Sequence, residues 1–129
     1  MREPDGPAGQ RNEVGDRMNH CLSQKEICEQ FGSIFDPPGE DERLGIALST
    51  LSRTPLNAAR HPAENGTCGW YVWGGELTDS PDFFQPLRVH HLAGLVSSMV
   101  PYLALAPGWR VLWAPGYVDV WHDMALLAG

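Results

Sequence analysis

The sequence is poor in cysteine, and its three thiols are badly placed for disulfide bonds. Cys21, Cys28 and Cys68 are odd in number and show no C-x-x-C spacing. A chain of 129 residues can build a core without disulfides. The residues after Met1 also contain no apolar stretch that could act as an export signal. We therefore expect a protein of the reducing cytoplasm.

Long apolar runs are missing as well. The nearest candidate, residues 92–106, is interrupted by Ser97, Ser98 and Pro101, whereas a bilayer-spanning helix needs about 20 apolar residues. The sequence thus predicts no membrane span. Its hydrophobic content of 43% instead predicts a globular protein.

Basic residues are scarce. Nine lysines and arginines face sixteen aspartates and glutamates, which gives a net charge of −7 and a pI near 5.0. Nucleic-acid binders and proteins that bind anionic membranes need basic surfaces, so both partners are excluded. A basic protein partner would be favoured, mainly through its association rate. The plainer alternative is that the acidity only keeps the domain soluble.

Metal-ligand spacing is also absent. The five histidines are His20, His61, His90, His91 and His122, and no H-x-x-x-H pattern occurs among them. Adjacent histidines point apart on a regular element, so we predict no metal site and no cofactor.

The sequence also lacks an obvious catalytic set. Cys68 is the one candidate nucleophile, but a small cysteine entering a strand is more often a core residue. An enzyme alternative is a small hydrolase that uses Cys68 or His61 with Glu76 or Asp79.

The most informative segment present reads Gly69-Trp70-Tyr71-Val72-Trp73-Gly74-Gly75-Glu76. Aromatic and β-branched residues favour a strand, predicted here at residues 68–76. Trp70 and Val72 would share one face, and Tyr71 and Trp73 the other. Large aromatics on both faces imply a strand covered on both sides, or one whose second face binds something.

Weaker patterns predict the other elements. A short helix is predicted by a capping box at residues 23–26 and an apolar stripe through Ile27 and Phe31. Gly32 is its expected end. Residues 42–52 show leucines at helical spacing, although alternation through Leu44 and Ile46 leaves a strand open. An extended segment is predicted at residues 56–61, a helical turn at 82–85, helical structure at 90–102, and strands at 109–113 and 117–121.

These elements predict one α+β domain over residues 20–129. We expect a small mixed or antiparallel sheet built around the 68–76 strand and a C-terminal hairpin, with two or three short helices packed on it. Residues 1–19 are rich in glycine, proline and charge and predict a disordered tail. Met18 at its end is an alternative to Met1 as the natural start.

The aromatic segment, with its Gly-Trp-aromatic core and following Gly-x-Glu, resembles the signature of a family of bacterial immunity proteins. These are small antidotes of polymorphic toxin systems. The resemblance covers roughly residues 43–123. It is carried further by the short motifs Asp82-Phe83-Phe84, Pro86-Leu87, His91-Leu92, Pro101-Tyr102-Leu103, Pro107-Gly108-Trp109-Arg110 and Asp119-Val120-Trp121.

The resemblance implies a compact, non-catalytic α+β domain that binds and neutralises a cognate toxin. The alternative is a stand-alone structural or interaction domain without a toxin partner. If the target were a nuclease toxin, an acidic face could occlude its basic groove by mimicking phosphate charge. The candidate partner-binding residues are Asp36, Glu40, Asp41, Glu42, Trp73, Glu76, Asp79 and Asp82. The oligomeric state stays open, since an unpaired strand edge could support a dimer.

Overall fold

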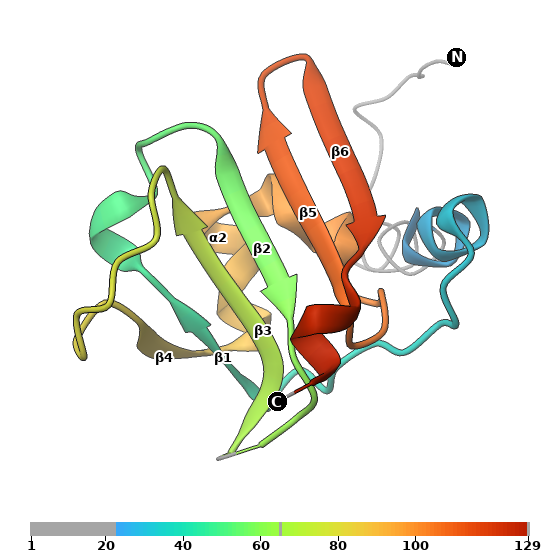
Figure 1. The fold of residues 1–129 in the computed structure, drawn as a ribbon, viewed down its shortest axis with the longest axis horizontal. Coiled ribbons are helices and arrows are strands. Elements are labelled where there is room, and N and C mark those ends of the chain that lie inside the picture. Colours follow the sequence, from blue (N-terminus) through green and yellow to red (C-terminus); the bar gives the residue numbers. More distant parts are fainter. Residues whose placement is uncertain (1–22, 65, 129) are drawn as a thin grey trace.

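The computed structural model describes residues 23–64 and 66–128, which form a mixed β-sheet with short helical segments packed on it. The six strands lie in the order β4-β1-β3-β2-β5-β6 (Figure 1). β1 and β3 are parallel, and the other neighbouring pairs are antiparallel. The strands are β1 (Arg43–Ile46), β2 (Leu56–Arg60), β3 (Thr67–Gly74), β4 (Gln85–Arg88), β5 (Trp109–Ala114) and β6 (Tyr117–His122). The predicted α+β class is confirmed.

Three sequence predictions fall where the structure gives no description. The tail at residues 1–19, the alternative start Met18 and the thiol of Cys21 all lie outside the described residues.

β3 is the aromatic strand predicted from the sequence, and it lies between β1 and β2. Its side chains alternate between the two faces, as a pleated strand requires. Trp70 and Val72 are buried in the main core on one face. Trp73 and the partly buried Tyr71 belong to a smaller cluster on the other. The prediction that Trp70 and Val72 share one face of the strand, and Tyr71 and Trp73 the other, is therefore confirmed.

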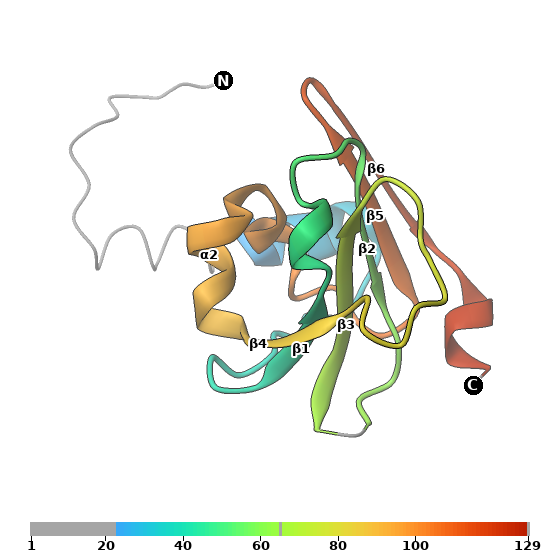
Figure 2. The same cartoon turned by 90° about the vertical axis from the view of Figure 1, so that its left-hand side faces the viewer.

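Helical segments cover the face that carries the main core (Figure 2). They are the helix at residues 23–31 and the short pieces η2 (Val89–His91), α2 (Leu92–Leu95) and η3 (Ser97–Tyr102). These pieces replace the single helical stretch predicted at 90–102, and Pro101 lies inside η3. Leu92 and Met99 are buried with Trp70 in the main core.

The helix at residues 23–31 ends as predicted. Gly32 adopts a φ of +91°, a conformation that glycine reaches without steric cost. The amides of Gly32 and Ser33 both donate to the Cys28 carbonyl, at 2.8 and 2.9 Å. These bonds satisfy a carbonyl that the helix would otherwise leave unpaired.

The helix predicted for residues 42–52 is wrong. That segment forms β1 and the short 3-10 helix η1 (Leu48–Thr50). β1 lies between β3 and β4, and its last three residues are buried. Leu44 and Ile46 both join the main core. The alternation through Leu44 and Ile46, which indicated a strand as the alternative, predicted the structure correctly. Burial between two neighbouring strands decides the conformation of so short a segment.

The helical turn predicted at residues 82–85 is also wrong. Residues 81–83 form a non-helical turn, and β4 begins at Gln85. β4 is an edge strand, and an edge position is where a sheet tolerates a proline such as Pro86.

The remaining strand predictions are confirmed. The extended segment at residues 56–61 is β2, and the C-terminal hairpin is β5 and β6, joined across Pro115 and Gly116. η4 (Met124–Leu127) follows the hairpin and was not predicted. Among the described residues, no helix has the length and apolar character needed to cross a bilayer.

Candidate functional site

The face of the sheet opposite the main core carries a cluster of aromatic rings, which we call the aromatic face. Phe84, from the segment between β3 and β4, packs edge-on against Tyr71, Trp73 and Phe83, with centroids 5.1, 6.0 and 4.9 Å apart. Leu126 of η4 joins the same cluster. Trp73 is only 6% exposed. The second face of β3 is thus covered above Trp73 and more open around Tyr71.

A cup of about 350 Å³ lies on this aromatic face. Its apolar lining comes from Ala59, Tyr71, Trp73, Leu77, Phe84 and Leu126. Three polar side chains complete the lining: His61, Glu64 and Arg110. A concave apolar site with a few polar groups is the common form of a binding pocket.

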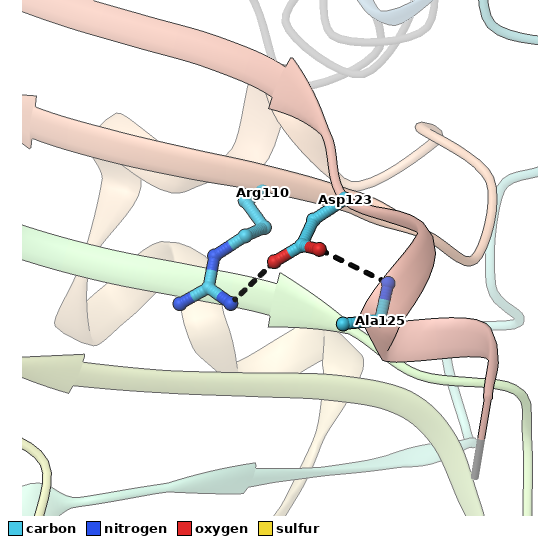
Figure 3. Close-up of polar contacts among 3 residues, drawn as sticks. All are labelled: Arg110, Asp123 and Ala125. Atoms are coloured by element: carbon cyan, nitrogen blue, oxygen red, sulfur yellow. Dashed lines mark hydrogen bonds and ion pairs between the residues drawn. The ribbon is translucent and has the colours of Figure 1, made fainter.

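An ion pair fixes one wall of the cup (Figure 3). Arg110 Nη1 donates to Asp123 Oδ2 at 3.2 Å. The other carboxylate oxygen of Asp123 accepts the amide of Ala125 at 3.0 Å and so caps the start of η4. The Arg110 guanidinium also lies 5.8 Å from the ring of Trp121. The charge of Arg110 is therefore balanced, and Asp123 couples the strand to the element that carries Leu126.

Four of the eight predicted binding residues belong to the aromatic face or its border. Trp73 lines the cup itself. Glu76, Asp79 and Asp82 are exposed in the segment between β3 and β4, which also supplies Leu77 to the cup.

The other four predicted residues lie elsewhere. Asp36, Glu40, Asp41 and Glu42 precede β1, whereas Glu76, Asp79 and Asp82 follow β3. Because β1 and β3 are parallel, these acidic groups occupy opposite ends of the strand pair. The structure does not bring them together into one acidic face.

The acidic segment before β1 borders a second cleft, of about 690 Å³, on the helical side of the sheet. Glu40, Asp41 and His90 contribute to its lining. The amide of His90 donates to the Glu40 carbonyl at 3.1 Å, and Arg88 Nη1 donates to the Asp41 carbonyl at 2.9 Å. The backbone of the segment is thus held against the start of η2, and the carboxylates of Glu40, Asp41 and Glu42 remain exposed.

Arg60 is a residue whose role the sequence did not indicate. It is 5% exposed and lies over the ring of Trp70. Its guanidinium donates to the carbonyls of Asp36 at 2.7 Å and Leu105 at 2.8 Å, and its Nε to that of Cys68 at 3.2 Å. Burial lowers the pKa of Arg60, an effect opposed mainly by Asp36. Arg60 therefore ties the acidic segment and the chain after η3 to the sheet.

The enzyme alternative finds no support in the arrangement of its residues. Cys68 is buried in the main core, and His61 lines the cup on the opposite face. Burial raises the pKa of the Cys68 thiol, which disfavours the nucleophilic thiolate. Glu76 and Asp79 follow the end of β3 remote from Cys68. Within residues 23–64 and 66–128, no group of three or more histidine, cysteine or acidic residues could hold a metal ion.

Sequence reasoning missed most of the cup. Alternation along β3 placed Tyr71 beside Trp73, but His61 and Arg110 reach the same face only through the pairing of β2 with β3 and β5. Ala59, for example, pairs with both Tyr71 and Arg110. No local pattern in the sequence encodes that register.

Comparison with known proteins gives one family match. A family model described as Imm33-like domain matches residues 23–123. The match begins earlier than the residue-43 limit inferred from the sequence and takes in the helix at residues 23–31. No curated protein and no solved structure matches the chain.

Proposed function

Because the chain belongs to the Imm33-like domain family, a family of the immunity type, we propose that it binds a cognate bacterial toxin directly and neutralises it. The observation that carries this proposal is the family match over residues 23–123, which includes all six strands. The protein acts in this proposal as a binding partner without a reaction of its own.

The aromatic face supports the proposal with a surface suited to protein binding. Its cup is concave and largely apolar, Glu64 contributes to its lining, and the segment that supplies Leu77 carries three further exposed acidic residues. Protein interfaces concentrate their binding energy in such pockets, where aromatic residues are enriched and water is excluded. Trp73, Glu76, Asp79 and Asp82 are the predicted residues that would serve this surface.

The acidic segment before β1 would then have a separate role. Asp36, Glu40, Asp41 and Glu42 lie at the other end of the strand pair from the second acidic group. Long-range attraction does not require contact, so these residues can speed the encounter with a basic toxin. A toxin with a basic substrate groove would gain most from this attraction.

A reconstitution experiment tests the proposal. The tagged protein is recovered from its host in moderate salt, and the toxin-domain protein that remains bound is identified by mass spectrometry. That toxin domain is then expressed with and without this protein. We expect cells that make the toxin domain to grow only when they also make this protein. We also expect the two proteins to form a complex of equal stoichiometry in light scattering. Rescue of growth without a complex would contradict neutralisation by direct binding.

The alternative is a stand-alone interaction domain with the same core and no toxin. This alternative predicts a different result when the tagged protein is recovered from its host, because no toxin-domain protein should then remain bound in near-equal amount. That outcome would remove the support for the antidote role.

A further inference from the structure

The cup on the aromatic face has walls suited to a long side chain with a planar end. Tyr71 and Phe84 meet edge-on at 5.1 Å, and Tyr71 also meets the ring of His61 edge-on at 5.5 Å. Leu77 is 57% exposed at the rim, while Trp73 is 6% exposed at the base. A guest that enters past Leu77 would thus contact aromatic rings along its length.

The charges around the cup favour a cationic guest. Arg110 is the one arginine in the lining, and its charge is already balanced by Asp123 at 3.2 Å. Glu64 also contributes to the lining and is exposed. Glu76, Asp79 and Asp82 add negative charge on the segment that carries Leu77. The local balance has the same sign as the net charge of −7 for the whole chain.

We propose that this cup is the docking site for an arginine side chain presented by a basic segment of the toxin. The methylene stem would pack on Leu77 and Phe84, and the guanidinium would stack on Tyr71. Glu64 would accept its N–H groups in a charge-assisted, two-pronged hydrogen bond. Arginine fits better than lysine because its planar group both stacks and offers paired donors. The identity of the partner rests on the proposed function, but the chemistry of the cup does not.

A small probe tests the cup without the toxin. N-acetyl-arginine methylamide is titrated into the ¹⁵N-labelled full-length protein, with the citrulline analogue as its uncharged, nearly isosteric control. We expect saturable shifts centred on Ala59, Tyr71 and Arg110, with affinity at least fivefold higher than for citrulline. Equal affinity for the two probes, or shifts centred elsewhere, would overturn the proposal. A preference for N-acetyl-glutamate or N-acetyl-phenylalanine methylamides would overturn it as well.

Matched variants test the role of Glu64. Glu64→Gln removes one charge at the cup, and Glu29→Gln removes one on the helix at residues 23–31, which covers the opposite face of the sheet (Figure 2); both residues are exposed. We expect Glu64→Gln to abolish the preference for arginine over citrulline and Glu29→Gln to preserve it. Leu77→Ser, at an exposed rim position, should weaken both probes alike. An unchanged preference in Glu64→Gln would contradict the assignment of that carboxylate.

The toxin found by reconstitution separates this inference from the proposed function. If the toxin binds and Glu64→Gln weakens the complex at least tenfold while Glu29→Gln does not, the antidote role and the docking site are both supported. Equal binding by the wild type and Glu64→Gln would overturn the cup as the docking site and leave the antidote role intact. If no toxin binds, the antidote role fails, and the probe titration alone decides whether the cup selects arginine.

Discussion

The aromatic signature in β3 serves mainly to pack the fold. The Trp70 indole is fully buried, and its Nε1–H donates to the Leu103 carbonyl at 2.9 Å. Gly69 adopts a φ of +100°, and a Cβ built on it would run into the carbonyl of His61. A Cβ added at Gly74 would likewise clash with the carbonyl oxygen of Thr50. The segment therefore holds this fold together, and Tyr71 and Trp73 are its residues that also reach the cup.

Gly69→Ala should destabilise the protein by about 3 kcal/mol. The left-handed conformation costs an alanine roughly 1–2 kcal/mol, and the clash with the His61 backbone adds to it because backbone cannot move aside cheaply. Gly32→Ala is the matched control, since its φ is +91° and nothing lies near its Cβ position. It should lose only about 1–2 kcal/mol. Urea unfolding followed by tryptophan fluorescence compares the two, and equal losses would contradict the steric argument.

The buried Cys68 thiol should make stability fall in mildly alkaline solution. Burial raises the pKa of Cys68 in the folded state, so its neutral form stabilises the fold. Below about pH 8.5, the ordinary thiol pKa, this contribution is fully present. Above it the unfolded chain loses the proton first, and the free energy of unfolding falls by up to about 1.4 kcal/mol per pH unit. Urea unfolding from pH 7 to 10 measures the slope.

The Cys68→Ala variant is the control for this thiol. Its free energy of unfolding should decline less steeply above pH 8.5 than that of the wild type. Some dependence of the free energy of unfolding on pH should remain in the variant, because burial also raises the pKa of Cys28 and of Tyr102. An unchanged slope would show that Cys68 does not contribute.

At the scale of elements, η4 depends on one carboxylate. Asp123 caps η4 through the Ala125 amide and also binds Arg110. Asp123→Ala removes both interactions and should cost about 1–2 kcal/mol, mostly from the lost cap. Asp123→Asn keeps a capping oxygen and should cost less than 1 kcal/mol, since a partly exposed ion pair contributes little.

Thermal unfolding and hydrogen exchange measure the effect of the two Asp123 variants. Exchange at the amides of Ala125 and Leu126 should accelerate in Asp123→Ala more than in Asp123→Asn. Equal protection in both variants would contradict the capping role.

Elements with strong local patterns could be predicted from the sequence. β3 has a run of aromatic and β-branched residues, and the β5–β6 hairpin has Pro115-Gly116 between two such runs. β1 was predicted only as an alternative to a helix and β4 was not predicted, because each is only four residues long and owes its conformation to its neighbours. Leucine spacing near Leu44 suggested a helix, and burial between two strands overrode it.

Only part of the candidate site could be predicted, because only some of its contacts follow from local sequence patterns. Trp73 and Tyr71 could be assigned to one face because alternation is local. Arg110 and His61 lie 39 and 10 residues from Tyr71 along the chain and meet it only through sheet register. The two acidic groups could be recognised by composition, but the parallel pairing that separates them could not.

At the scale of the whole molecule, the charge of −7 should govern how quickly a basic toxin binds. Attraction between exposed charges is screened by salt, whereas packed contacts are much less affected. We therefore expect the association rate constant to fall about tenfold between 50 and 500 mM salt, with a small change in dissociation. Stopped-flow mixing with the purified toxin measures both rates.

Charge variants test whether the acidic segment before β1 produces the salt-dependent part of the association rate. A Glu40→Lys, Asp41→Lys, Glu42→Lys triple variant should bind more slowly at low salt and dissociate at the normal rate, because these residues lie away from the cup. A faster dissociation would instead place the segment inside the interface.

The order of the strands also sets when the cup can form during the synthesis of the protein. β2 is complete at residue 60 but acquires its second neighbour only when β5, at residues 109–114, has been made. Leu126 and the Arg110–Asp123 pair complete the wall of the cup later still. A nascent chain on the ribosome therefore has no finished cup until translation has passed residue 126. If the protein neutralises a toxin as proposed, a cell that makes both at the same time would need finished copies of this protein from earlier rounds of translation.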